Sequence, residues 1–327
     1  MKDSQFQMPV TLVLGGTGML GSAITRCLFN SAGMVGKRVV SVGSDDCDLT
    51  NQHEVSMLFR LLNPTDVYHC AGFVGGIQVN AENQYEMLYE NSMMALNVIN
   101  AALENGVKRF VYVSSSCAYP TGTPQPMEER TLEYAYLGQL PSSNRGYATA
   151  KTVGQLACQY AAKKGGIWLT AVPCNLYGPG DDFSEDGHVL ASLVAKFVDA
   201  VDASTPGYFP SVTIWGSGKP RREFLWVDDA AAAIINVAHR TGPGAPIVNI
   251  GSGVDLTIAE LANKIKKEVG FTSDIIYDAT KPDGVHQKLL NVHKLKTTIY
   301  DWKPTVDIDI GIIRMIKAYR ALKKEIS

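Results

Sequence analysis

The sequence predicts an α/β fold in which a doubly wound parallel sheet is followed by a smaller α/β C-terminal lobe. Three observations carry this prediction: short apolar runs alternate with helical segments, a glycine-rich turn separates the first run from the first helix, and the pattern changes after Asn175. Strands that alternate with helices are typical of parallel sheets covered on both faces. The glycine turn after the first strand indicates the Rossmann type of sheet.

The first half of the chain contains the expected strand–helix alternation. Runs rich in β-branched and other apolar residues predict strands, and apolar residues at helical spacing predict helices. The expected strands are 11–14, 38–42, 66–71, 109–113 and 169–173, and the expected helices are 22–29, 91–105 and 147–164. This order predicts repeated βαβ units.

After Asn175 the composition changes, because glycine, proline and acidic residues cluster in 178–187. Helices are expected at 189–201, 228–239, 257–269 (with Thr257 as its cap) and 310–324, and strands at 212–215 and 246–250. Segments 228–239 and 246–250 could rejoin the first sheet. We therefore predict two domains, the Rossmann domain over 1–174 plus about 222–250 and the smaller lobe over 175–221 plus about 251–327.

Composition excludes several classes of partner. The 327 residues are 46% hydrophobic with a formal net charge of -2, so neither nucleic acid nor an acidic membrane surface is an expected partner. The longest apolar run, Ala230 to Ala238, is too short to cross a bilayer, and Val10 to Leu14 runs into glycines unlike a signal peptide. Six scattered cysteines without metal-ligand spacing predict reduced thiols, no metal and a cytoplasmic location.

A glycine loop lies directly between the first strand and the first helix. It consists of Gly15, Gly16, Thr17, Gly18, Met19, Leu20 and Gly21. In such a loop the glycines allow a tight turn, a close approach to a pyrophosphate and close packing of the helix, whose N-terminus presents free N–H groups. A lone glycine motif would be a flexible turn, but its place in a βαβ unit predicts a nicotinamide dinucleotide site.

The residues after the second strand leave the choice between NAD and NADP open. An acidic residue there favours a free 2′-hydroxyl, whereas an arginine favours a 2′-phosphate. Asp45 and Asp46 lie slightly beyond the expected position, and no arginine is near.

Ser115, Tyr147 and Lys151 form a candidate catalytic set. Tyr147 and Lys151 are four residues apart at the start of a helix and share one face, and Ser115 follows a strand at its carboxyl end. Reduction of a carbonyl needs a proton donor, and a tyrosine can serve if a nearby ammonium, here that of Lys151, lowers its pKa from about 10. Such a Tyr–Lys pair alone is common on helix surfaces, but its order after the glycine loop and the serine is specific.

These motifs resemble the extended short-chain dehydrogenase/reductase family, and a longer series resembles its GDP-L-fucose synthase branch. The series, in order, is Val74–Ile77, Ser115–Pro120, Asn175–Pro179, Gly187–Val189, Trp215–Gly218, Arg222–Phe224 and Lys281–Gly284. Asp228–Asp229 and Asn249–Gly251 resemble the nucleotide-sugar branch of the extended family more generally. The resemblance implies an NADPH-dependent enzyme that epimerises GDP-4-keto-6-deoxy-D-mannose at C3 and C5 and then reduces C4. Alternatives are a related GDP-sugar reductase, a redox-neutral epimerase with NAD, and a non-catalytic dinucleotide sensor.

The resemblance also implies residue roles. Cys117 and His188 would be the epimerising acid–base pair, and Ser115, Tyr147 and Lys151 the reductase set. A thiol titrates near pH 8.5 and a histidine near 6.5, so both can exchange protons near neutrality. Without the motif, Cys117 would be expected to be a small buried hydrophobe and His188 a polar loop residue.

The resemblance also implies which residues contact the dinucleotide and which contact GDP. For the dinucleotide they are Gly15, Gly16, Thr17, Gly18, Met19, Leu20, Gly21, Ser44, Asp48, Leu49, Val113, Ser114, Lys151, Pro173, Asn175, Leu176 and His188. For GDP they are Lys196, Trp215, Arg222, Asp283 and Lys288. Thr17 and Ser44 stand where relatives carry basic residues, and Lys196 where an arginine is usual. A homodimer through helices 91–105 and 147–164 is also implied.

Overall fold

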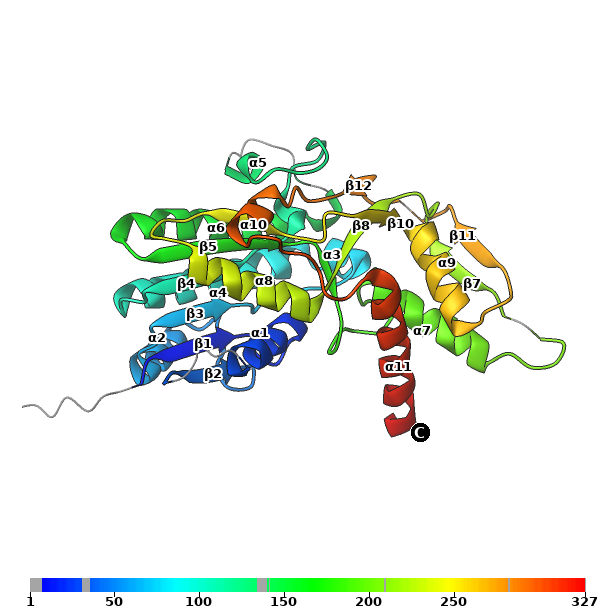
Figure 1. Ribbon diagram of the computed structural model, residues 1–327, viewed down its shortest axis with the longest axis horizontal. Coiled ribbons are helices and arrows are strands. Elements are labelled where there is room, and N and C mark those ends of the chain that lie inside the picture. The colour runs from blue at the N-terminus through cyan, green and yellow to red at the C-terminus, as the bar shows by residue number, and fades with distance from the viewer. Residues whose placement is uncertain are drawn as a thin grey trace, which may run out of the picture.

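The computed structural model describes residues 8–30, 36–133, 140, 142–208, 210–281 and 283–326. Pro282 of the Lys281–Gly284 motif and parts of the predicted first domain, 1–7 among them, lie outside the described residues. Figure 1 shows a large sheet with helices on both faces at one end and a smaller group of helices and strands at the other.

The large sheet has six parallel strands in the order β2-β1-β3-β4-β5-β9. The strands are β1 (Val10–Leu14), β2 (Arg38–Val42), β3 (Asp66–His69), β4 (Arg109–Val113), β5 (Ile167–Pro173) and β9 (Ile247–Ile250). From β1 the chain goes outward to β2 and then crosses to β3 on the other side of β1. Such a reversal opens a crevice at the carboxyl ends of the strands, where doubly wound sheets bind ligands.

Alternate residues of these strands face two separate cores, because successive side chains of a strand point to opposite faces. Val13 and Tyr68 pack against α1 (Met19–Phe29) and α8 (Val227–Arg240) on one face. The opposite face carries Leu12, Leu14, Val67, Phe110 and Tyr112, which pack against α2 (Gln52–Leu62), α4 (Gln84–Glu104) and α6 (Arg145–Ala161). In Figure 1, α8 and α1 lie on the near side of the sheet.

The smaller group has its own apolar core. Its elements are β6 (Asn175–Tyr177), α7 (Val189–Asp202), β7 (Val212–Trp215), β8 (Arg221–Trp226), β10 (Asp255–Thr257), α9 (Ile258–Val269), β11 (Ile275–Asp278), β12 (Gln287–Lys288) and α11 (Ile308–Ile326). Strand β8 pairs with β6, β10 and β12, and β11 pairs with β7. The shared core includes Leu190, Phe197, Ile214, Trp226, Leu261 and Ile312.

The predicted α/β class with a parallel Rossmann sheet is confirmed, and the expected strands at 38–42, 109–113 and 212–215 have the observed bounds. Thr257 caps α9 through a capping box with Glu260, as its side chain allows. Helix α4 begins at Gln84 instead of Asn91, and helix α1 at Met19 instead of Ser22. The strand predicted at 66–71 ends at His69.

The short elements were not expected from the sequence. They include β6, β8, β10, β11 and β12, together with the helices α3 (Ile77–Glu82), α5 (Glu129–Glu133) and α10 (His293–Thr298). Elements of two to six residues show too few turns or alternations for periodicity to identify them. Helix α2 is long enough, and its cap by Asn51 was a signal that the pattern analysis passed over.

A buried carboxylate joins three segments at the centre of the molecule. Glu223 on β8 is 0% exposed, and its two oxygens accept the backbone N–H groups of Gly253 (2.6 Å) and Leu290 (2.9 Å). Burial raises its pKa to about 7, against the hydrogen bonds that favour the charged form. The native state therefore holds a proton that the unfolded state releases at lower pH.

We expect Glu223→Ala to lower the free energy of unfolding by about 2–4 kcal/mol, because it leaves buried N–H donors without acceptors. The wild type should also lose stability as pH rises from 4.5 through about 7, where the native carboxyl ionises at a cost, and the variant should lack this slope. Urea unfolding across this pH range measures both. The exposed Glu268→Ala is the control, and a loss no larger than in that control would contradict the prediction.

Candidate active site

A cavity of about 1080 Å³ opens at the carboxyl ends of the large sheet, where the smaller group covers it. All predicted site residues except Gly16 line it. Gly16 faces β2 instead: its N–H donates to the Val42 carbonyl at 2.9 Å, and a Cβ would lie 1.9 Å from the Ser41 hydroxyl. Gly16 is thus required by close packing of the loop on β2, and it is not part of the cavity wall.

The glycine loop has the shape needed for a dinucleotide pyrophosphate. Gly15 has φ +73°, and a Cβ there would lie 2.5 Å from the Ala71 nitrogen. At Gly21 a Cβ would lie 2.1 Å from the Gly15 carbonyl oxygen, so α1 could not pack as closely. The N-cap of α1 is Gly18, so no side chain caps the first turn. Open N–H groups and the positive end of the helix dipole fit a phosphate there.

Residues 43–50 form the rim of the cavity beyond β2, and hydrogen bonds within this segment occupy its carboxylates. The Asp46 carboxylate accepts the Gly43 N–H at 2.8 Å, and the Asp48 carboxylate accepts both the N–H and the hydroxyl of Thr50. Ser44, between them, is exposed and lines the cavity. The lysines and arginines of the cavity wall are Lys151, Lys196, Arg222 and Lys288. No described lining residue on the glycine-loop and rim side is cationic.

The predicted reductase residues meet at one point of the wall. The Ser115 hydroxyl accepts the Cys117 N–H at 3.1 Å and hydrogen-bonds the phenol of Tyr147. The Lys151 ammonium donates to the Val113 carbonyl at 3.0 Å and lies 5.5 Å from the centre of the Tyr147 ring. The structure therefore brings together three groups that are separated by up to 36 positions in the chain.

The protonation states of this set differ from the simple expectation. The sequence suggested that Lys151 would pull the pKa of Tyr147 down. Instead, burial and the nearby Cys117 raise the pKa of Tyr147, and only the hydrogen bond from Ser115 lowers it. Burial also lowers the pKa of Lys151 to about 8. Because both groups lie deep in the wall, the loss of solvation outweighs the attraction between the Lys151 ammonium and a Tyr147 phenolate. Tyr147 therefore keeps its proton at neutral pH.

Cys117 lies against the ammonium of Lys288. The Lys288 Nζ is 3.3 Å from the Cys117 Sγ, and the two residues are 171 positions apart. Burial would raise the pKa of the thiol, but Lys288, the hydrogen bond with Ser115 and the charge of Arg222 outweigh it, so the pKa lies below its usual value. This places Lys288 beside the sulfur, where it stabilises a thiolate.

His188 has a carboxylate partner that sequence analysis missed. Its Nδ1 lies 3.2 Å from Oδ1 of Asp181, whose side chain is 2% exposed. This contact raises the pKa of His188, although burial opposes it. The acidic cluster at 178–187 was noted only as composition, and the pairing arises from how the loop folds back to the start of α7.

The residues predicted for GDP have separate surroundings. Trp215 is 43% exposed, with the Lys281 ammonium 4.9 Å from its ring centre. Asp283 accepts the N–H (2.8 Å) and hydroxyl (2.6 Å) of Ser217, so it joins two loops of the wall. The Arg222 guanidinium donates to the Val285 carbonyl at 2.7 Å. The carboxylate of Asp283 is thus already hydrogen-bonded within the protein, to Ser217.

Asn91 on α4 shapes the loop opposite the reductase set, and sequence analysis did not identify it. Its amide accepts the Phe73 N–H and donates to the Phe73 carbonyl, each at 3.0 Å. A Cβ on Gly72 would lie 3.0 Å from the Asn91 oxygen and 3.4 Å from the Lys151 ammonium. Asn91 therefore holds this loop close to Lys151.

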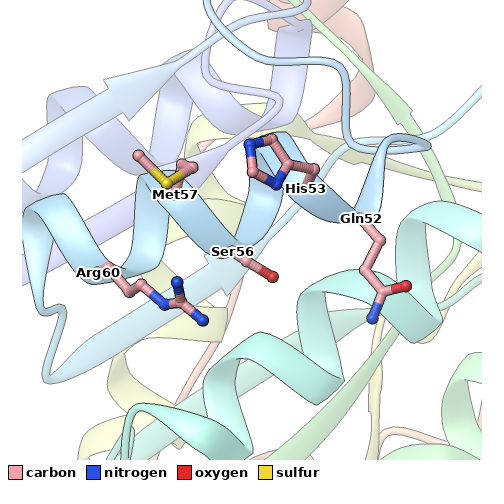
Figure 2. Close-up of a pocket in the computed structure, with 5 residues that line it drawn as sticks. All are labelled: Gln52, His53, Ser56, Met57 and Arg60. Atoms are coloured by element: carbon pink, nitrogen blue, oxygen red, sulfur yellow. The ribbon is translucent and has the colours of Figure 1, made fainter.

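A second, smaller pocket lies on α2, away from this cavity. Figure 2 shows its lining, Gln52, His53, Ser56, Met57 and Arg60. All five side chains come from one helix, so nothing encloses a ligand there. Among the residues that the structure describes, no helix is both long and apolar enough to cross a membrane.

Comparisons with known proteins agree with this geometry. The model of the NAD dependent epimerase/dehydratase family matches residues 11–251. A probable GDP-L-fucose synthase 1 of Oryza sativa subsp. japonica is 38% identical over 94% of this chain and 90% of its own. GDP-L-fucose synthase of Escherichia coli (strain K12) is 37% identical over 92% and 93%.

A solved structure extends the similarity to three dimensions. The GDP-L-fucose synthetase of Naegleria fowleri bound to NADP superposes with a TM-score of 0.84 at 25% identity, covering 97% of this chain and 96% of that one. With the glycine loop, the Ser115, Tyr147 and Lys151 set and these relatives in view, the chain belongs to the NAD-dependent epimerase/dehydratase family, in its GDP-L-fucose synthase branch.

Proposed function

We propose that this chain converts GDP-4-keto-6-deoxy-D-mannose to GDP-L-fucose by epimerisation at C3 and C5 and reduction at C4. One observation carries the proposal: a single cavity holds an acid–base pair, Cys117 and His188, beside the Tyr147 and Lys151 set and the glycine loop. A redox-neutral epimerase with bound NAD would use the phenol for transient oxidation but would have no need of a further acid–base pair in the same wall. The family membership supports the same reaction.

The epimerisation half needs a base and an acid near the sugar. The C4 carbonyl acidifies the protons on C3 and C5, so that a base removes each one with formation of an enolate, and an acid returns a proton to the opposite face. Cys117 has a lowered pKa and suits the base, and His188 has a raised pKa and suits the acid. Each inversion returns the number of protons that it removes.

The reduction half uses the neutral phenol. A bound nicotinamide dinucleotide would supply a hydride to C4. Tyr147 then gives its proton to the C4 oxygen as the C–O double bond is lost, Ser115 donates a hydrogen bond to that oxygen, and the Lys151 ammonium stabilises the phenolate that Tyr147 leaves. The raised pKa of Tyr147 matches a strongly basic alkoxide.

We propose that the two groups of elements divide binding. The sequence predicts that 1–174 plus about 222–250 hold the dinucleotide and 175–221 plus about 251–327 the nucleotide sugar, and strand β8 (Arg221–Trp226) moves to the second part because it belongs to the small sheet. The chain crosses between the groups at Trp226, because β8 pairs in the small sheet whereas α8 and β9 join the large one. Lys196 and Arg222 would face the diphosphate and Trp215 the base or sugar. Asp283 would contribute to GDP binding indirectly, by holding the loop that carries Ser217 in place.

We also propose a homodimer in the cytoplasm. Helices α4 and α6 pack on each other and expose large apolar side chains, namely Tyr85, Leu88, Tyr89, Leu96 and Tyr160. An apolar helical face of this kind is typical of a subunit interface. The scattered free cysteines support a reducing compartment.

We expect the purified enzyme, incubated in D₂O with GDP-4-keto-6-deoxy-D-mannose and NADPH, to form GDP-L-fucose with deuterium at C3 and C5. Tyr147→Phe should slow product formation at least about 100-fold, because proton donation is lost, and should keep the deuterium exchange. NMR of the sugar measures both. The exposed Tyr160→Phe is the matched control.

The outcomes separate the alternatives. Reduction at C4 without deuterium at C3 or C5 would show a reductase for this or another GDP-4-keto sugar and would sink the epimerase half. Bound NAD with no net consumption of NADPH would show a redox-neutral epimerase. A wild type that shows neither exchange nor reduction would favour a non-catalytic dinucleotide sensor, and so would a Tyr147→Phe variant that leaves all cellular function unchanged.

Lys288→Met should raise the pKa of Cys117, since it removes the ammonium 3.3 Å from the sulfur and leaves burial to dominate. Alkylation of Cys117 by iodoacetamide at pH 7 should slow about 10-fold, one pKa unit being a factor of ten in thiolate. Mass spectrometry of the Cys117 peptide gives the rate against pH. Lys267→Met, on an exposed position of α9, is the control, and equal rates in wild type and Lys288→Met would contradict the prediction.

We propose NADPH as the hydride source, as the resemblance to the family implies. NADH should be able to replace it, because the rim beside Ser44 carries carboxylates and no described lining cation that would select a 2′-phosphate. The ratio of kcat/KM for NADPH to that for NADH should lie within about tenfold. Ser44→Arg should raise this ratio about tenfold or more by adding a charged hydrogen bond to the 2′-phosphate. Asn263→Arg, on exposed α9, controls for net charge, and a ratio unchanged by Ser44→Arg would place the 2′ position elsewhere.

A further inference from the structure

The loop before α7 builds a charged partner for His188. His188 is the N-cap residue of α7, and its ring Nδ1 lies 3.2 Å from Asp181 Oδ1. Because Nδ1 is engaged, Nε2 is the ring nitrogen free to exchange a proton. The two residues are only seven positions apart, yet no regular element joins them, so their contact depends on the loop conformation.

The Asp181 carboxylate is held in place and kept from water. Its Oδ1 also accepts the Asp182 N–H at 3.0 Å, and its own N–H donates to the Gly178 carbonyl at 3.1 Å. The side chain is 2% exposed, and Oδ2 is buried with no hydrogen-bond partner among the described residues. A buried carboxylate with one open oxygen is costly, so its contact with His188 is a strong constraint on the ring.

The rest of the loop is anchored as well. Gly187 donates to the Ser184 carbonyl at 3.2 Å, and the Gly76 N–H donates to the Asp186 carbonyl at 2.8 Å. The Asp182 carboxylate accepts both the N–H and the hydroxyl of Ser184. These bonds fix the path from Asp181 to His188 and tie it to the loop that faces the cavity at Gly76.

The charges facing His188 are those of Asp181, Asp182 and Cys117, together with the N-terminal end of α7. The helix dipole disfavours a positive ring at a helix N-terminus. The three negative groups favour a positive ring and so act against the helix dipole. Among them, the hydrogen bond to Asp181 contributes most to the raised pKa of His188. Without that carboxylate, the ring would hold its proton less well at neutral pH and could turn or change tautomer.

We propose that Asp181 is a positioning residue for the epimerisation half of the reaction: it accepts the Nδ1–H of His188 and thereby fixes the ring with Nε2 toward the cavity. This inference rests on the proposed function. It assigns Asp181 no contact with the substrate and no part in the reduction at C4. A carboxylate that orients a catalytic imidazole is a known physical arrangement in other sites, and its loss there costs activity through the wrong tautomer.

The test is solvent exchange by Asp181→Asn, which keeps the size of the side chain and removes its charge. With GDP-4-keto-6-deoxy-D-mannose in D₂O and no NADPH, the rate of deuterium entry at C3 and C5 should fall about 10- to 100-fold, with KM changed less than about threefold. The limb of the pH–rate profile that requires protonated His188 should move to lower pH by about one unit. With NADPH present, the share of C4-reduced but unepimerised product should rise.

Asp182→Asn is the matched control, because it removes a neighbouring carboxylate of the same loop that bonds Ser184 and not His188. It should keep exchange within about threefold and move the pH limb less than Asp181→Asn does, because Asp182 acts on His188 by charge alone and makes no hydrogen bond to it. Loss of exchange in Asp181→Asn with an unmoved pH limb would mean a merely structural role and would overturn the proposal. An exchange rate equal to that of wild type would overturn it as well.

A second measurement does not depend on the folding of the variant. The His188 ring of the wild type, assigned in the NMR spectrum by comparison with His188→Gln, should titrate with a midpoint above 6.5. A midpoint at or below 6.5 would refute the role of Asp181. Failure of the proposed function is distinct: wild type would then show no exchange at all, whereas failure of this inference leaves wild-type exchange intact.

Discussion

The geometry of the site depends on the buried carboxylate of Glu223. Glu223 accepts N–H groups from the turn after β9 and from Leu290, two residues beyond Lys288. Its neighbour on β8 is Arg222, which lines the cavity. The Glu223 carboxyl group therefore ties the strand that carries Arg222 to the segment that carries Lys288, and both cations act on Cys117. A carboxylate without exposure to water has to satisfy its oxygens inside the protein, which leaves these segments little freedom.

Asn249 extends this network to the other side of the cavity. Its side-chain amide donates to the carbonyls of Met127 and Asn291 and accepts the Tyr119 hydroxyl, and its backbone N–H donates to Glu129. Tyr119 follows the Ser116–Ala118 turn that carries Cys117. The large sheet and the segment before α10 are thus joined by satisfied buried polar groups. A satisfied network of this kind specifies one arrangement, whereas apolar packing tolerates several.

Opposite charges beside Cys117 and His188, the proposed acid–base pair, are the second feature of the site. Lys288 lies against Cys117 and Asp181 against His188, so each group is biased toward a different protonation state before a substrate binds. On the reductase side burial dominates instead, and it keeps Tyr147 protonated and Lys151 easier to deprotonate. One cavity therefore offers three separate environments for the proposed proton removal, proton return and proton donation to an oxygen.

The sequence by itself determined the features that depend on local pattern. Apolar alternation and helical spacing predicted the parallel sheet, and the glycines of Gly15 to Gly21 predicted the dinucleotide loop, because backbone sterics act over a few residues. The Tyr147–Lys151 pair was visible for the same reason, since four residues on a helix share a face. Tertiary structure alone decided that Gly16 packs on β2, that Asp283 joins two loops, and that burial governs Tyr147. It also decided the pairs Lys288–Cys117 and Asp181–His188, because contacts across long separations or irregular loops follow from packing and not from any period in the chain.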